Sequence, residues 1–171
     1  MKLERFQEEV DGAARWNFGK LYVEHSSKRD AYSISLHLRS ADRDEIAAVT
    51  LKPPVRVLVD GIAESDPCYT IKTAGGKPCG LFGVRDSGHP QSAVVWMLGT
   101  DDLTNNGRTF LRHSRYWLDE LHRNYRLLFN VIDARNSVHQ RWLDWMGFDI
   151  VQEIEKYGIE RRKFLLFRRY V

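Results

Sequence analysis

Apolar residues recur along the chain in the patterns of β-strands. Residues 20–25 (KLYVEH) alternate between apolar and polar, as a half-buried strand does. Residues 92–99 (SAVVWMLG) and 127–132 (LLFNVI) are apolar on both sides, which is typical of strands with both faces buried. Residues 149–155 and 163–169 are predicted to form two closing strands, joined through Tyr157-Gly158.

A pair of glycines in the middle of the chain predicts a hairpin. Residues 68–73 and 78–84 are strand-like and flank Gly75-Gly76, and adjacent glycines favour the left-handed backbone of tight hairpin turns. A turn centred on the two glycines places Cys68 opposite Gly83 rather than Cys79. The two cysteines are therefore not a cross-strand pair.

Helical spacing appears between the first strand and this hairpin. From Ser27 the pattern becomes helical, and one broad apolar side is formed by Tyr32, Ile34, Leu36 and Leu38. Pro53-Pro54 ends the helical pattern that follows and permits a new helix over residues 55–62.

Ser40 is the expected N-cap of the helix that ends at this proline pair. Asp42, Asp44 and Glu45 then fall in or next to its first turn, where the helix dipole favours acidic side chains.

Two helices are predicted in the second half of the chain. Phe110, Ser114, Trp117 and Leu121 follow helical spacing, and arginines occupy most of the opposite, outer face. Asn136 can cap a short helix over residues 138–146, which Gly147 ends in the manner of a C-terminal cap. The tryptophans at helical spacing, Trp117, Trp142 and Trp145, could stack on nucleic-acid bases, but we interpret them as core residues.

The order of elements predicts an α+β fold with a central mixed sheet and helices on its faces. The 171 residues suit one domain, which we assign to residues 18–171. Residues 1–17 form an N-terminal extension with weak helical spacing at Leu3, Phe6 and Val10.

Composition narrows the class of protein. Aromatic residues make up 12% of the chain, which excludes disorder as the dominant state. The longest apolar run, residues 93–98, is far shorter than the ~20 residues that a membrane-spanning helix needs, and the N-terminus has no apolar signal core. Two cysteines cannot form a disulfide framework. These features predict a soluble intracellular protein with no membrane span.

The net charge of +3 is concentrated near the C-terminus. A polyanion such as nucleic acid could bind there, through Arg161, Arg162, Lys163, Arg168 and Arg169. The alternative is an edge strand that its charges protect from pairing with other chains.

Several motif classes are absent from the sequence. The six histidines are dispersed and form no HExxH run, so no metal site is predicted. Glycine-rich nucleotide loops and the Gly-x-Ser-x-Gly nucleophile elbow are also missing.

The order of elements resembles the fold of the GCN5-related N-acetyltransferases (GNAT). A narrower resemblance is carried by PCGLFGV, VVWMLGTDDL, FLRHSRYWLDEL and LLFNVIDARNSVHQRWLDWMGF, together with LRSADRDEI at residues 38–46. These segments are similar to an acetyltransferase-like family of tailed bacteriophages. That resemblance implies an internal virion or assembly protein, with other phage structural proteins as partners, located in the host cytoplasm during assembly and in the virion.

The resemblance allows the acetyltransferase site to be compared residue by residue. Active members bind the coenzyme A pyrophosphate with an Arg/Gln-x-x-Gly-x-Gly/Ala loop, whose backbone N–H groups approach the phosphates. The matching stretch here is 104–109 (TNNGRT), which keeps only Gly107. Arg108 and Arg112 could attract phosphates instead, or they belong to a charged outer helix face.

The catalytic groups of the family are also altered. The tyrosine that often protonates the departing thiolate corresponds to Leu143, which has no proton to give. His139 replaces a small residue; it could act as an acid, or it could cap the helix or pack against Trp142. Candidates for the base are Glu24 on the first strand and Asp101 or Asp102 after the fourth.

Two functions follow from these comparisons. The first is a phage virion-associated or morphogenesis protein with an acetyltransferase-like fold, catalytically inactive, without a cofactor, and acting through protein–protein contacts. The alternative is an acetyl-CoA-dependent N-acetyltransferase with an altered pyrophosphate loop. Backbone amides of residues 95–99 would then hold the pantetheine, and the predicted cofactor-binding residues are Leu98, Gly99, Asn106, Gly107, Arg108 and Thr109.

Overall fold

The computed structural model describes residues 3–171, which form one nine-stranded mixed sheet. The strands are β1 Gln7–Val10, β2 Ala13–Asn17, β3 Leu21–His25, β4 Cys68–Thr73, β5 Pro78–Asp86, β6 Ser92–Gly99, β7 Leu127–Asp133, β8 Asp149–Tyr157 and β9 Arg162–Tyr170. Their order across the sheet is β1-β2-β3-β4-β5-β6-β7-β9-β8. Neighbouring strands are antiparallel except β6 and β7, which are parallel.

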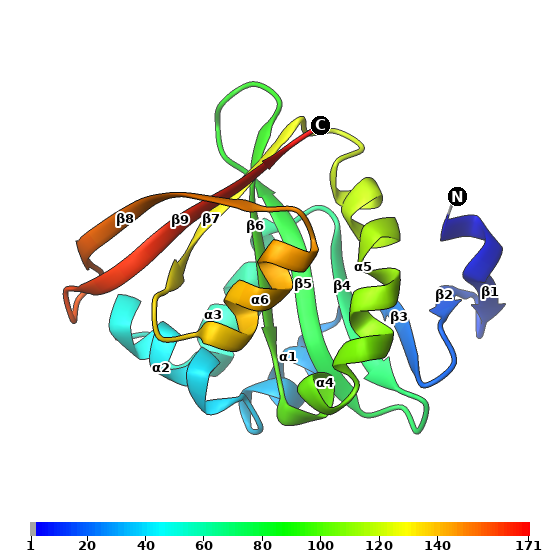
Figure 1. Cartoon of the computed structure of the whole chain (residues 1–171). Coiled ribbons are helices and arrows are strands. Elements are labelled where there is room, and N and C mark those ends of the chain that lie inside the picture. Colours follow the sequence, from blue (N-terminus) through cyan, green and yellow to red (C-terminus); the bar gives the residue numbers. More distant parts are fainter. Residues whose placement is uncertain (1–2) are drawn as a thin grey trace.

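Helices cover both faces of this sheet, as the sequence predicts. They are the 3₁₀ turn η1 Leu3–Phe6 and the helices α1 Lys28–Ser35, α2 Ser40–Val49, α3 Pro54–Glu64, α4 Asp101–Asn105, α5 Gly107–Leu121 and α6 Ser137–Trp145. Figure 1 shows α5 and α6 in front of the sheet and α1 and α3 behind it. One apolar cluster packs under α5 and α6, and a second packs around Ile34, Leu58 and Leu81 under α1 and α3.

The strand predictions in the body of the domain are confirmed. The β4–β5 hairpin turns at the two glycines, and Cys68 lies opposite Gly83 as expected. Strand β6 covers the predicted residues, and β7 extends its predicted range by one residue. Asn136 caps α6 by accepting the His139 N–H, and Gly147 follows that helix with a φ of +79°.

The weak helical prediction for residues 1–17 is wrong beyond the single turn of η1. Residues 7–10 and 13–17 form a hairpin that turns at Asp11 and Gly12, both of which have positive φ. Strand β2 then pairs with β3, so the hairpin extends the main sheet. The spacing of Phe6 and Val10 suggested a helix, but Asp-Gly is a strong hairpin turn and it determines the local structure.

Two details of the early helices also differ from prediction. Tyr32 and Leu36 are exposed, and only Ile34 and Leu38 of the expected apolar side are buried; helix α1 ends at Ser35. Helix α2 begins at Ser40 rather than being capped by it, and its N-cap, Arg39, makes no side-chain capping bond.

Strands β6 and β7 separate partway along their length. They pair only from Ser92 to Val94 and from Leu127 to Phe129, although both strands continue beyond these residues. At the point of separation the Asn130 side chain donates to the Val95 carbonyl at 2.8 Å. Figure 1 shows β7 running away from β6 below their paired ends. The sheet is therefore open between these two strands.

Candidate functional site

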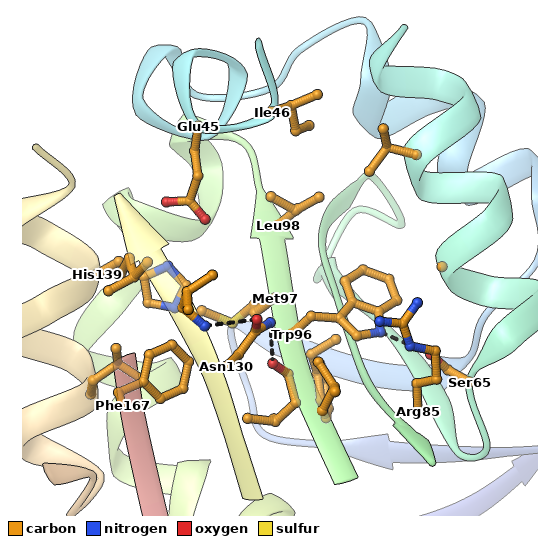
Figure 2. A pocket seen from close by; sticks show the side chains of 18 of the residues that line it. Glu45, Ile46, Ser65, Arg85, Trp96, Met97, Leu98, Asn130, His139 and Phe167 are labelled. Atoms are coloured by element: carbon orange, nitrogen blue, oxygen red, sulfur yellow. Dashed lines mark hydrogen bonds between the residues drawn. The ribbon is translucent and has the colours of Figure 1, made fainter. Parts of the chain in front are cut away.

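A cavity of about 470 Å³ occupies the opening between β6 and β7. Helices α2 and α3 line it on one face of the sheet, and α5 and α6 line it on the other. Its walls are mainly apolar and include Val95, Met97, Leu98 and Val131 (Figure 2). Exposed charged side chains such as Lys52 and Arg85 also line it, so the cavity reaches the surface beside α3.

Glu45 of α2 is the carboxylate that lines this cavity deep in the fold. Its Oε2 accepts the Asp133 N–H at 3.1 Å and the Asn136 side-chain amide at 3.4 Å. Burial raises the pKa of Glu45 to about 7, and the nearby carboxylates of Asp42 and Asp133 also favour the protonated form. Among residues 3–171 it makes no ion pair, so its charge is uncompensated when it ionises.

His139 of α6 faces the same cavity from the other side (Figure 2). Burial lowers the pKa of its ring to about 4, so the ring is neutral at pH 7. Within the described residues neither ring nitrogen has a hydrogen-bond partner, and the ring packs edge-on against Trp142 with 6.2 Å between ring centroids. The structure therefore places His139 against Trp142, and the capping role belongs to Asn136.

A buried ion pair lies at the end of β6. Asp42 Oδ1 is 2.6 Å from Arg39 Nη2, and both residues are at least 95% buried. Asp42 Oδ2 accepts the Gly99 N–H at 2.8 Å, while the Arg39 N–H donates to the Gly99 carbonyl at 3.0 Å. The Arg39 guanidinium also lies over the Trp142 ring, 5.2 Å from its centroid. Both backbone polar groups of Gly99 are thus already bonded.

The predicted cofactor-binding residues do not all line the cavity. Leu98 lines the cavity, whereas Asn106, Gly107, Arg108 and Thr109 lie outside it, where α4 meets α5. The stretch 104–109, where the sequence suggested a phosphate loop, is largely helical: Thr104 and Asn105 end α4, and α5 begins at Gly107. Trp142 packs against Gly107, 3.6 Å from where a Cβ atom would lie. The buried side chain of Trp142 therefore lies at the start of α5.

The candidate bases predicted from sequence lie away from the cavity. Glu24 of β3 forms ion pairs with Arg15 at 2.7 Å and Lys72 at 2.9 Å. Burial opposes its charge, but the hydrogen bonds from Lys72 and Arg15 prevail and lower the pKa of Glu24. Asp101 is exposed at the start of α4, and Asp102 pairs with Lys77 at 2.7 Å. None of these carboxylates lines the cavity.

Leu143, which the resemblance aligned with the acetyltransferase tyrosine, stands in the wall of the cavity. Its side chain is hydrocarbon only, so no hydroxyl is available there for proton transfer.

The basic residues near the C-terminus lie on β9 and its turn, beside an acidic strand. Arg162 pairs with Glu160 at 2.5 Å, and Lys163 pairs with Glu153 at 2.5 Å. Arg168 lies opposite Asp149 in the β8–β9 register. Neighbouring acids therefore offset much of the positive charge that the sequence concentrates in this segment.

Sequence reasoning missed Arg39, Asp42 and Glu45 as members of the site. The segment LRSADRDEI was singled out, but its acids were assigned to the helix dipole. Their partners Gly99, Asp133 and Asn136 are distant in sequence, so the local pattern carries no signal of the contact.

Among residues 3–171, no helix is both long enough and apolar enough to cross a lipid bilayer. No protein-family model and no curated protein sequence matches this chain.

Solved structures, by contrast, resemble the chain over most of its length. A putative acetyltransferase from Acinetobacter baylyi is 14% identical and superimposes with a TM-score of 0.70 over 88% of this chain and 93% of its own. Ard1 from Thermoplasma volcanium is 14% identical, with a TM-score of 0.69 over 90% and 99%.

The microcin C7 self-immunity acetyltransferase, solved with acetyl-CoA and AMP, is 11% identical, with a TM-score of 0.67 over 91% and 96%. Identities this low establish shared architecture only. The chain therefore has the α+β fold of the GNAT acetyltransferases.

Proposed function

We propose that this protein uses the acetyltransferase fold without acetyl-CoA catalysis and acts through contacts with other proteins, in the assembly or the interior of a phage particle. The observation that carries the proposal is the Arg39–Asp42 pair on Gly99. In the acetyl-CoA alternative the backbone amides of residues 95–99 would hold the pantetheine, and here both backbone groups of Gly99 bond within the protein. This bonding supports a site that acts without acetyl-CoA.

Two further features support the absence of the usual chemistry. Leu143 provides no acid for a leaving thiolate. In the stretch 104–109, whose amides would face the pyrophosphate, Thr104 and Asn105 belong to α4, and the N–H of Asn106 already donates to carbonyls of α4.

Titration calorimetry and thermal unfolding with acetyl-CoA test the catalytic part of the proposal. A ligand that binds the folded state raises the melting temperature by mass action. We expect neither binding heat nor a shift in Tm at millimolar acetyl-CoA. A saturable micromolar affinity would overturn the proposal.

The acyltransferase alternative is favoured by one observation, the carboxylate of Glu45. A carboxylate with a pKa near 7, facing a cavity between separated strands, has the properties of a general base that accepts a proton from an amine. This alternative predicts that Glu45→Gln abolishes acetyl transfer to amines, whereas the non-catalytic proposal predicts no transfer by either protein.

The phage role rests on the resemblance of residues 20–171 to the phage family. Mass spectrometry of purified particles from the phage that encodes this chain tests it. We expect the protein in mature particles or in assembly intermediates. Its absence from both would contradict this part of the proposal and leave the acetyl-CoA result unaffected.

A further inference from the structure

A row of arginines follows the outer face of α5. Arg108, Arg112 and Arg115 are exposed and spaced by four and three residues, which places them within about 60° of one another around the helix. The row is about 10 Å long at 1.5 Å per residue.

Helix α6 lies beside the first half of this row. The Trp145 Nε1 donates to the Leu111 carbonyl at 3.4 Å, and the rings of Phe110 and Trp142 are 5.2 Å apart. Arg141 is exposed one helical turn before Trp145, on the same side of α6. We call Arg108, Arg112, Arg115, Arg141 and Trp145 the α5–α6 arginine face.

The charges of this face are not compensated by ion pairs. None of its four arginines has an ion-pair or hydrogen-bond partner within residues 3–171. The exposed acids nearest in sequence are Asp119 of α5 and Asp144 of α6, which leaves the positive charges in excess. The basic residues of β9, by contrast, lie beside the acids of β8.

Trp145 was interpreted from sequence as a core residue, but its side chain lies at the surface. Trp117 and Trp142 are buried, but Trp145 is 59% exposed. The hydrogen bond to Leu111 fixes the indole edge on α5, so an accessible aromatic surface is held against the helix that carries the arginine row. Exposed aromatics next to phosphate-binding cations are the arrangement on which unpaired bases stack.

We propose that the α5–α6 arginine face binds single-stranded nucleic acid. The arginines contact consecutive phosphates and Trp145 stacks on a base. An anionic membrane would also attract the arginines, but the single fixed indole suits a base better than a lipid surface. The proposal goes beyond the protein–protein role above and does not depend on acetyl-CoA.

Fluorescence anisotropy with labelled oligo(dT), measured over a range of salt concentrations, tests the proposal. The plot of log K against log salt has a negative slope, and each lost phosphate contact makes that slope about 0.7 less steep. Arg112→Gln with Arg115→Gln removes two contacts and should therefore weaken binding about twentyfold near 0.1 M salt. The matched control is Arg161→Gln with Arg162→Gln, which removes the same charge from the β8–β9 turn and should weaken binding far less.

Trp145 gives a second readout that charge alone does not change. Trp145→Ala should weaken binding by about tenfold while leaving the salt slope unchanged, and Trp145→Phe should restore most of the affinity because a phenyl ring also stacks. Circular dichroism checks that each variant is folded.

Three results would each overturn the proposal. They are no salt-dependent binding of oligo(dT) by the unmodified protein, an equal loss in the β8–β9 control, and binding to phosphatidylserine vesicles without binding to oligo(dT).

Discussion

Asp42 holds together parts of the chain that are far apart in sequence. Its carboxylate pairs with Arg39, accepts the Gly99 N–H, and lies 3.4 Å from the Asn136 amide. The residue joins the start of α2 to the end of β6 and to the cap of α6. Its side chain is almost wholly buried in the first turn of α2, so these bonds add to the favourable effect of the helix dipole.

Replacing Asp42 should therefore be costly. In Asp42→Asn the Arg39 guanidinium stays buried without its counter-charge, and we expect the free energy of unfolding to fall by about 3–5 kcal/mol in urea denaturation. Asp44→Asn, an exposed change on the same helix, should cost less than about 0.5 kcal/mol. Arg39→Met with Asp42→Leu removes both charges and should cost less than Asp42→Asn alone; a larger cost would contradict this account.

Glu45 and His139 act in opposite directions on the pH dependence of stability. The folded pKa of Glu45 is raised from 4.5 to about 7, so its stabilising contribution is complete below pH 4.5 and is lost as pH rises through 7. The folded pKa of His139 is lowered from 6.5 to about 4, so its contribution is present above pH 6.5 and is lost as pH falls through 4. The two effects largely cancel between these limits.

Glu45→Gln should expose this cancellation. Glutamine resembles the protonated carboxyl, so we expect unchanged stability at pH 4.5 and a gain of as much as ~3 kcal/mol at pH 8. Chemical denaturation at several pH values measures the free energy of unfolding at each pH. Glu153→Gln, at an exposed position, is the control. A loss of stability at pH 8 would show that ionised Glu45 is stabilised by the fold.

Most of the elements could be predicted from local pattern. The register of the β4–β5 hairpin followed from Gly75-Gly76, and the strands at 92–99 and 127–132 followed from runs too apolar to be exposed. The first hairpin could not be recognised from periodicity, because three of the four β1 residues are polar and exposed. The buried polar network escaped prediction because its members meet only when α2, β6, β7 and α6 are packed together.

The N-terminal hairpin is packed on the domain through aromatic contacts. The ring centroid of Phe6 lies 5.2 Å from that of Tyr116 and 4.8 Å from that of Phe18. The ring centroids of Trp16 and Trp117 are 5.4 Å apart. Residues 1–17 were assigned from the sequence as an extension of the domain. In the structure, strand β2 of this segment pairs with β3 and so joins the main sheet.

Deleting residues 1–17 should consequently destabilise the whole domain. Removal exposes one edge of β3 and the aromatic surface of α5, so we expect Tm to fall by several degrees, since about 1 kcal/mol corresponds to 2–4 °C in a chain of this size. Differential scanning calorimetry measures the shift. Trp16→Ala in the full chain should reproduce much of it, and an unchanged Tm in both variants would show that the hairpin is independent of the domain.

The whole molecule combines a fold shared with acetyltransferases and a cavity between β6 and β7. Its surface charge is also distributed differently from what the sequence suggests, because acids of β8 and of the β8–β9 turn offset part of the positive charge of the C-terminal segment. Strand pairing brings acidic and basic residues together from different parts of the sequence. Counting charged residues along the chain therefore does not give the net charge of a surface.

The separation of β6 from β7 has a mechanical consequence. Backbone pairing between the two halves of the sheet is limited to three residue pairs, and a cavity of about 470 Å³ lies along the rest of the junction. Unfolding eliminates internal voids and so lowers the volume of the system, which makes a molecule with a large cavity sensitive to hydrostatic pressure. High-pressure NMR should show resonances of Val95, Met97 and Val131 responding before those of the β4–β5 hairpin. Compression would then divide this sheet along the line where its two halves meet.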